Sequence, residues 1–200
     1  MNKKKRLLIA TDNFLPRWDG ISRFLSQIIP EIKSIYDITI ITPKFKGKLK
    51  HINGVKLIRL PIHNFHIGDY QPTKLNIMKI KEYINKTDLL WVQTIGPIGA
   101  TAIFLAKLSK KPIVAYIHSI ESDLVSKSIR KTPIIQRIIY SIVKGFSRLC
   151  YNRCDLLMVP SLDTAEILSW QKIKTKKAIV NLGIDADQFN QPINKRLAKK

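Results

Sequence analysis

The stretch RLLIATDNFLPRWDGISRFL (residues 6–25) joins a short apolar run to an amphipathic segment through a loop. The loop holds Pro16, Trp18 and Asp19, and Gly20 stands at the entrance of the expected helix. Such a glycine lets a ligand approach the backbone closely, and the amides of a first helical turn favour an anion such as a phosphate. An ordinary surface turn punctuated by proline and glycine is the alternative interpretation.

The same alternation of apolar run and helical segment recurs along the chain. Ile- and Val-rich runs predict strands at 6–11, 37–42, 55–60, 88–93, 112–117, 155–160 and 178–182. Helical patterns fall between them at 21–35, 74–85, 99–108, 133–151 and 162–170. Pro30 lies inside the first of these helices and is expected to kink it or end it early. The alternation predicts an α/β fold, a single Rossmann-like, doubly wound, mainly parallel sheet with helices on both faces. Ligands of such folds bind beyond the carboxyl ends of the strands.

Length and charge bound the organisation of the chain. Its 200 residues suit one domain, which we expect over 1–189, with 190–200 as a basic linker or tail. The formal charge of +21 attracts the phosphates of lipids, nucleic acids or sugar nucleotides, although a general compositional bias explains it equally well. No RNA-binding motif, zinc finger or helix-turn-helix accompanies the charge, so no specific nucleic-acid partner is expected.

Cysteine and histidine usage argues against a metal site. Cys150 and Cys154 are the only cysteines, and they are interpreted as packing residues of a cytoplasmic protein. The spacing of His63 and His66 lacks a third ligand and is interpreted as a plain loop. No apolar run is long enough to span a bilayer, so any membrane contact is expected to be peripheral, on the inner face of the cell membrane.

Polar and small residues follow several of the predicted strands. The segment QTIGPIGA (93–100) gives a tight entrance to the next helix. His118 stands at the end of the fifth strand, with Glu121 three residues later. A neutral imidazole at that place can hydrogen-bond a sugar, and a satisfied structural histidine is the alternative.

The segment 133–151 predicts a long helix with a narrow basic stripe. Arg137, Lys144 and Arg148 share one face with Ser141, and Lys131 precedes the helix. Two interpretations stay open. The stripe can dock on anionic lipid headgroups, or the helix is well buried and the stripe is its solvated side.

Four pieces together resemble the retaining glycosyltransferases of family 4. They are TDNFLPRWDGISRFL, AYIHSIES, YNRCDLLMVPS and NLGIDADQF, which occur in the family's order and at roughly its spacing. The resemblance spans almost the whole chain and points to the branch of lipid-directed mannosyl-, glucosyl- and sulfoquinovosyltransferases. It implies the N-terminal, acceptor-side half of a GT-B fold.

The resemblance also implies roles for particular residues. Gly20, with Asp19, would lie over the donor phosphates, and His118 would touch the transferred sugar at the reaction centre. The acceptor side would be lined by Asp12, Arg17, Trp18 and Glu121. The family often has two glycines in the first loop, whereas this chain has Asp19 before Gly20.

The chemistry implied is transfer of a hexosyl unit from a nucleotide sugar to a hydroxyl of a lipid or glycan acceptor, with retention and without a cofactor or an obligatory metal. The family continues into a second, donor-binding domain, for which 200 residues leave no room. We therefore expect a separate donor-binding subunit or a longer parent chain. A non-enzymatic half-domain that binds anionic lipid or a partner protein is the alternative.

Overall fold

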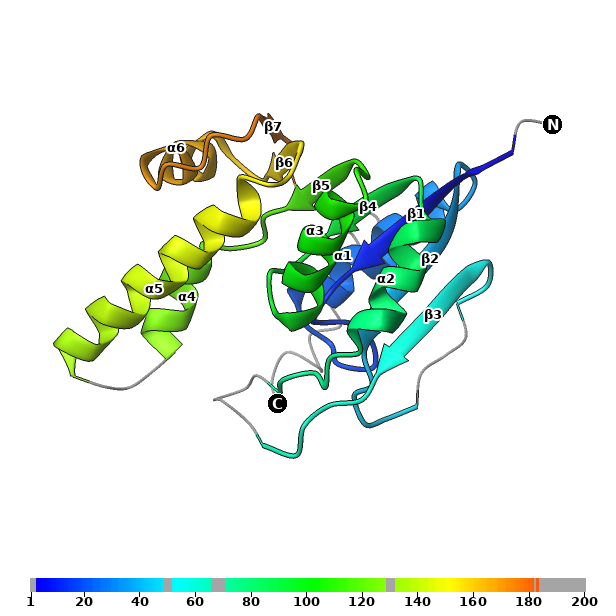
Figure 1. The fold of residues 1–200 in the computed structure, drawn as a ribbon, viewed down its shortest axis with the longest axis horizontal. Coiled ribbons are helices and arrows are strands. Elements are labelled where there is room, and N and C mark those ends of the chain that lie inside the picture. The colour runs from blue at the N-terminus through cyan, green and yellow to red at the C-terminus, as the bar shows by residue number, and fades with distance from the viewer. Residues whose placement is uncertain (1–2, 49–51, 66–70, 129–131, 182, 184–200) are drawn as a thin grey trace, which may run out of the picture.

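The computed structural model describes residues 3–48, 52–65, 71–128, 132–181 and 183, and its centre is one parallel sheet (Figure 1). The strands are β1 (Lys5–Ala10), β2 (Tyr36–Pro43), β3 (Val55–Leu60), β4 (Leu89–Val92), β5 (Ile113–Tyr116), β6 (Leu156–Val159) and β7 (Lys177–Ile179). Their order is β3-β2-β1-β4-β5-β6-β7, and every pairing is parallel. The predicted strands are thus confirmed, with ends shifted by a few residues.

Six helices occur among the described residues. They are α1 (Gly20–Ile32), α2 (Ile77–Lys86), α3 (Pro97–Leu108), α4 (Glu121–Ser128), α5 (Pro133–Tyr151) and α6 (Leu162–Trp170). All but α4 were predicted, and α5 and α6 have the predicted bounds. Helix α1 ends at Ile32, two residues after Pro30 and before the predicted end at 35.

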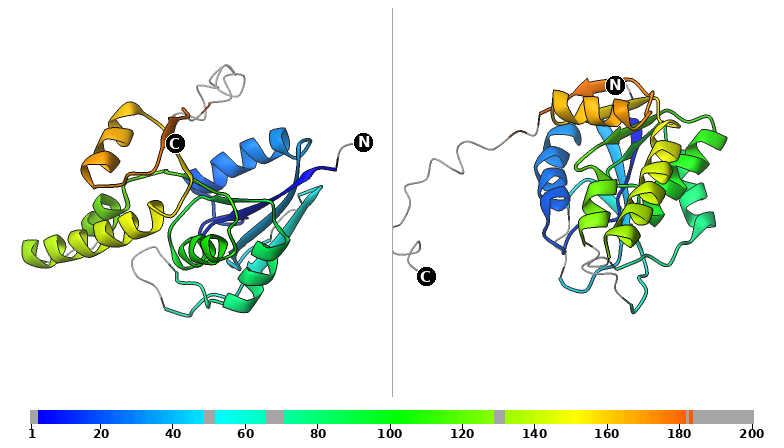
Figure 2. Two further views of the ribbon diagram at one scale, coloured as in Figure 1. Left: turned by 45° about the horizontal axis from the view of Figure 1, so that its top comes forward. Right: turned by 90° about the vertical axis from the view of Figure 1, so that its left-hand side faces the viewer.

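The helices cover the two faces of the sheet unequally. Ile29 and Leu25 of α1 pack on Ile9 and Ile38 in one core. On the other face, α2, α3 and the last turn of α5 pack on β1, β4, β5 and β6 in a second core. Figure 2 shows α1 on one side of the sheet and α2 and α3 on the other. Right-handed crossovers require this arrangement, because β1 leads to β2 in one direction and β4 leads to β5 in the other.

The strand register brings the carboxyl ends of the central strands level. Ala10 pairs with Ile41 on one side and with Val92 on the other, and Val92 pairs with Ala115. The strand order reverses between β1 and β4, which makes this the switch point of the sheet. The loops that leave Ala10, Val92 and Tyr116 therefore meet where such folds bind ligands.

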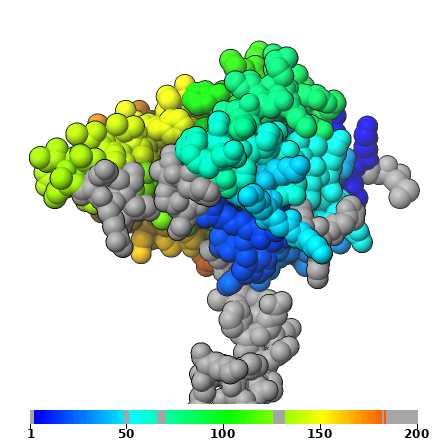
Figure 3. Space-filling view, turned by 90° about the horizontal axis from the view of Figure 1, so that it is seen from below, coloured from blue at the N-terminus to red at the C-terminus, as the bar shows by residue number. Residues whose placement is uncertain are grey.

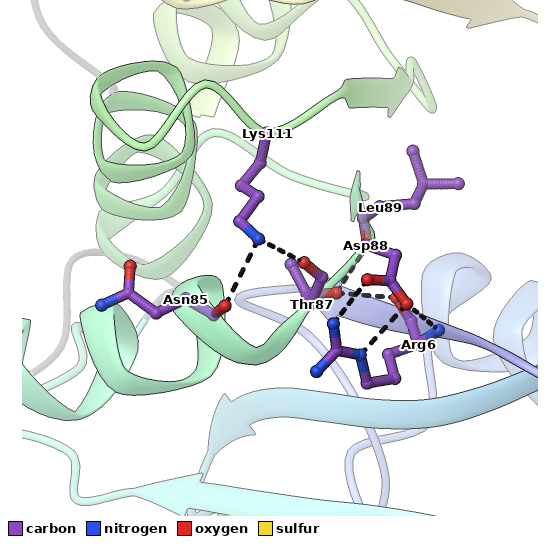
Figure 4. Close-up of polar contacts among 6 residues, drawn as sticks. All are labelled: Arg6, Asn85, Thr87, Asp88, Leu89 and Lys111. Carbon is purple, nitrogen blue, oxygen red and sulfur yellow. Dashed lines mark hydrogen bonds and ion pairs between the residues drawn. The ribbon is translucent and has the colours of Figure 1, made fainter.

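The amino ends of the same strands are tied at the opposite edge (Figure 4). The Arg6 guanidinium lies 2.6 Å from Asp88 Oδ1, which joins β1 to the residue before β4. Lys111 Nζ donates to the carbonyl oxygen of Thr87 at 2.8 Å and to that of Asn85 at 3.3 Å. These bonds fix the ends of α2 and α3 relative to β4, away from the switch point.

Helix α5 projects beyond the sheet. Its last two turns contribute buried Ser147, Cys150 and Tyr151, whereas the earlier turns pack mainly against α4. Figure 1 shows α4 beside α5, and Figure 3 shows α5 protruding at one end of the molecule. No helix in the described part of the chain is long and apolar enough to cross a membrane. Cys150 and Cys154 are buried and unpaired, which confirms them as packing residues.

Gly99 is required by packing, and this gives a test of the α3 entrance. A Cβ atom there would lie 1.7 Å from the carbonyl oxygen of Thr94 and 3.1 Å from Val92 Cγ1. Gly99→Ala should lower the free energy of unfolding by roughly 3 kcal/mol. The control is Gly145→Ala, where a Cβ meets no atom within 4 Å in an exposed helical turn. It should raise stability by roughly 0.5–1 kcal/mol. Urea unfolding of both variants measures this, and equal stabilities would contradict the packing described.

Candidate functional site

The switch point is organised by one buried carboxylate, that of Asp12. Ile98 N–H donates to Asp12 Oδ1 at 2.9 Å, and Gly99 N–H donates to Oδ2 at 3.2 Å. The Thr94 hydroxyl donates to Oδ2 at 2.8 Å and accepts from the Asp12 amide at 2.8 Å. Asp12 thereby caps α3 from the loop after β1, and a Cβ at Gly96 would lie 2.5 Å from its Cγ. Glycine at 96 leaves room for this carboxylate.

The position of Asp12 corrects the role expected for it. Its side chain is 2% exposed and points at the start of α3, so it does not line an open acceptor surface. Burial raises the pKa of Asp12, and the donors from Ile98 and Thr94 partly oppose that shift. The residue holds the loops after β1 and β4 together, and any effect on an acceptor would pass through those loops.

The loop before α1 gathers the other predicted residues of the opening stretch. Asp19 is the N-cap of α1, and its Oδ1 accepts from Ser22 N–H at 2.9 Å. Arg17 Nε lies 3.5 Å from Asp19 Oδ2. Trp18 is 61% exposed, with the Arg23 guanidinium 5.9 Å from its ring centroid. A side chain at Gly20 would meet no atom within 4 Å, so packing does not demand this glycine. The loop thus presents an open helix N-terminus with charged and aromatic neighbours.

His118 lies beside this loop at the end of β5. Its Nε2 is 2.8 Å from Gln93 Oε1, and its ring stands edge-on to Phe24 of α1 with centroids 5.3 Å apart. Burial lowers the pKa of His118 from 6.5 to about 4, and the negative charge of Asp19 acts in the opposite direction. The imidazole is therefore neutral at pH 7. The structure brings Asp19, Gly20 and His118 to one edge of the sheet.

Among the described residues, Glu121 makes its side-chain hydrogen bond with α5 and none with Asp19 or His118. It lies in the first turn of α4 and accepts a hydrogen bond from the Tyr151 hydroxyl of α5. Burial raises the pKa of Glu121 from 4.5 to about 7, and the Tyr151 bond acts in the opposite direction. Its carboxyl group joins α4 to α5, and its place on the acceptor side stays a prediction.

Gln93 is the polar neighbour of His118 that the sequence interpretation missed. It was assigned to the end of a strand, whereas β4 ends at Val92 and Gln93 begins the loop. The Gln93 side chain engages Nε2 of the ring, which leaves Nδ1 for a further hydrogen bond. A polar residue that closes the apolar run LLWV at a carboxyl end was the available signal. Within the described ranges, no group of three or more His, Cys, Asp or Glu could hold a metal ion.

Helix α5 exposes an apolar stripe as well as the predicted basic one. Arg137, Lys144 and Arg148 lie along one side of the helix, and Lys131 lies outside the described residues. The apolar stripe comprises large side chains that are 41–72% exposed, namely Ile134, Ile135, Ile138, Ile142, Phe146 and Leu149. The interpretation of α5 as a well-buried helix is therefore wrong, because only its last turns reach the core.

Comparison with known proteins identifies the family. The family model described as Glycosyltransferase Family 4 matches residues 18–188. The chain belongs to glycosyltransferase family 4. It is 22% identical over 190 residues to the alpha-monoglucosyldiacylglycerol synthase of Streptococcus pneumoniae (strain ATCC BAA-255 / R6). That alignment covers 94% of this chain and 42% of the relative, so the chain spans less than half of the relative's length.

Solved structures agree on the fold. A sucrose-phosphate synthase from Thermosynechococcus elongatus aligns with a TM-score of 0.54 and 10% identity, over 96% of this chain and 54% of that one. A second structure of that enzyme aligns with a TM-score of 0.50 and 12% identity, over 96% of this chain and 98% of that one. The family 4 domain described here therefore has the Rossmann-like architecture of GT-B glycosyltransferases, as the sequence predicted.

The raised pKa of the half-buried Glu121 predicts a pH dependence of stability. Its pKa is raised on folding, so its contribution is present at low pH and is lost as the pH rises from about 4.5 through about 7. Glu121→Gln keeps an oxygen for the Tyr151 hydroxyl but cannot ionise. The stability of the wild type relative to this variant should decline between pH 5 and about pH 7.5 in urea unfolding. His118 contributes in the opposite direction but is present in both proteins, so it cancels. A constant difference would contradict the raised pKa of Glu121.

Proposed function

We propose that this chain forms the acceptor-side half of a glycosyltransferase that moves a hexosyl unit from a nucleotide sugar to a lipid hydroxyl, with retention. The observation that carries the proposal is the meeting of Asp19, Gly20 and His118 at the switch point of a family 4 domain. The name of the Streptococcus pneumoniae relative describes synthesis of a glucosylated diacylglycerol, which favours a lipid acceptor. Because the chain spans 42% of that relative, a further polypeptide segment or a separate subunit would bind the donor.

The start of α1 supports a phosphate site of the donor. The amides of a first helical turn have no acceptor within the helix, and the helix dipole favours an anion there. Gly20 has open space around it, which allows close approach of a diphosphate. The negative charge of Asp19 is opposed by Arg17, 3.5 Å away. Stabilisation of a leaving diphosphate by such groups needs no obligatory metal or cofactor.

The surroundings of His118 support a contact between its imidazole and the transferred sugar. A neutral imidazole held by Gln93 and Phe24 can accept or donate one hydrogen bond to a hydroxyl of the transferred hexose without adding charge. Exposed Trp18, with the Arg23 guanidinium near its ring, and the neighbouring Arg17 offer a surface for the acceptor headgroup. Each group then orients substrate, and the diphosphate leaves toward the helix N-terminus.

The apolar stripe of α5 supports peripheral attachment to the cytoplasmic face of a membrane. An amphipathic helix with large exposed isoleucines and a basic flank inserts into the interface between headgroups and acyl chains. Arg137, Lys144 and Arg148 would lie beside anionic headgroups. The same stripe favours the second candidate, a non-enzymatic half-domain that binds anionic lipid or a partner protein, and transfer activity distinguishes the two.

The enzymatic proposal predicts that transfer activity is lost when a large side chain fills the space at Gly20. With a donor-binding half of a glucosyldiacylglycerol synthase supplied as a second polypeptide, the chain should transfer hexose from a nucleotide sugar to diacylglycerol. Gly20→Trp and His118→Ala should each reduce transfer at least about 100-fold, since one transition-state contact supplies roughly 3 kcal/mol. Ser34→Trp, exposed near the other end of α1, is the control and should remain active.

Two results would count against this proposal. Full turnover by the 200-residue chain alone would refute the half-domain role. Absence of transfer with every nucleotide sugar, while vesicle binding persists, would favour the non-enzymatic candidate.

The membrane proposal predicts binding to vesicles through α5. Flotation with phosphatidylglycerol and phosphatidylcholine vesicles should retain the wild type, and the double variant Ile138→Glu/Ile142→Glu should stay in solution. Replacing Arg137, Lys144 and Arg148 by alanine should weaken binding by about 1 kcal/mol for each charge, roughly 100-fold in all. Leu108→Glu is the control, because Leu108 is as exposed but ends α3 on another surface. Undiminished flotation of the double variant would refute the role of α5.

A further inference from the structure

A second apolar feature lies next to the switch point. It is a groove of about 630 Å³ formed by the approach to α2, by α3 and by one residue of α5. Its lining includes Ile77, Ile95, Gly96, Thr101 and Phe146. Of the described residues that line it, Thr101 alone carries a polar side chain. The groove is open along one side, and its volume accommodates part of a small ligand.

One end of the groove reaches the site. Ile95 and Gly96 line it, and both belong to the loop after β4. Gly96 also lies against the Asp12 carboxylate, since a Cβ atom there would come within 2.5 Å of Asp12 Cγ. A ligand lying in the groove therefore has its inner end beside the loops that carry the proposed reaction centre.

The other wall of the groove belongs to the apolar stripe of α5. Phe146 lines the groove, and it follows Ile142 by four residues and precedes Leu149 by three. These spacings place the three side chains on one face of the helix. Phe146 is 41% exposed, so the wall is continuous with the surface of α5. The groove thus connects the proposed membrane-facing stripe with the switch point.

We propose that this groove holds one acyl chain of a neutral glycerolipid acceptor, with the acceptor hydroxyl at the switch point. The proposal rests on the function proposed above and names the acceptor's binding mode. Each CH₂ group moved into an apolar groove avoids about 0.8 kcal/mol of exposure to water, so the groove allows a lipid to rise from the bilayer toward the site.

The lining favours an acyl chain over other occupants. An extended peptide would bury backbone N–H and C=O groups that need partners, and the lining offers little beyond Thr101. A charged headgroup would lose its hydration there without a counter-charge, whereas the basic side of α5 lies elsewhere on the helix. A neutral hydrocarbon chain requires neither.

Two neighbouring residues at the start of α2 give a matched test. Ile77 lines the groove and is 54% exposed, whereas Met78 is absent from the lining and is 74% exposed. An aspartate at either place lies in the first turn of α2, where it is favourable, so both variants should fold. Ile77→Asp puts a charge in the groove, and Met78→Asp puts the same charge beside it.

The first measurement is binding of a fluorescent, NBD-labelled diacylglycerol to the 200-residue chain. The wild type and Met78→Asp should bind saturably, and Ile77→Asp should bind at least tenfold more weakly. Thr101→Trp, which fills the groove from a partly exposed position, should behave like Ile77→Asp. Equal binding by all four proteins would overturn the proposal. So would a dimer of the wild type that Ile77→Asp dissociates, because the groove would then join two copies of the chain.

The second measurement separates the groove from the proposed function. In the reconstituted transferase, Ile77→Asp should raise KM for long-chain diacylglycerol at least tenfold and leave transfer to a water-soluble glycerol acceptor unchanged. Vesicle flotation of this variant should equal that of the wild type. If the wild type transfers to neither acceptor, the proposed function fails. If it transfers to both and Ile77→Asp matches it on both, the groove proposal fails.

Discussion

The buried carboxylate of Asp12 is the constraint on which the site depends. Four hydrogen bonds join it and its own amide to Thr94 and to the first turn of α3, across the point where the strand order reverses. A carboxylate buried to this degree is costly unless its oxygens are paired, and the amides of a helix N-terminus supply that pairing. The loops after β1 and β4 are therefore fixed relative to each other. Gly96 and Gly99 follow from this constraint, because a side chain at either would displace the carboxylate or the Thr94 carbonyl.

The uneven covering of the sheet explains why α5 has an exposed apolar side. Ser147, Cys150 and Tyr151 are its buried residues, and the Glu121–Tyr151 bond ties α4 to that same end. The earlier turns of α5 have α4 as their main neighbour, which covers one side of the helix and leaves the apolar stripe open. Burial of the last turn thus fixes the Phe146 end of the stripe at the groove beside the switch point. That geometry links the proposed attachment surface to the proposed acceptor groove.

Most of the fold could be predicted from the sequence, and part of the site could not. Short apolar runs identify every strand, and right-handed crossovers then bring Gly20 and His118 to one edge. The partner of Asp12 could not be predicted, because it lies more than eighty residues away and its carboxylate shows no pattern of its own. The segment ESDLVSKS of α4 has too weak an apolar period to indicate a helix. The spacing of apolar residues in α5 predicts an amphipathic helix, but it does not indicate whether the apolar side packs on the sheet or faces solvent.

The bonding of Asp19, which stands where the family often has a glycine, is compatible with the proposed anion site. As the N-cap, Asp19 accepts a hydrogen bond from the Ser22 amide. The earlier amides of the first turn have no acceptor inside the helix. The second oxygen of Asp19 lies near Arg17, so the carboxylate enters the site as one half of an ion pair. A diphosphate arriving at Gly20 would compete with Asp19 for Arg17. The same carboxylate acts on His118 against the effect of burial, so the charge at the helix start and the proton affinity of the imidazole are coupled. Binding of an anion at Gly20 would then change the pKa of His118 through Asp19. The charge in the loop and the protonation of the imidazole therefore depend on each other.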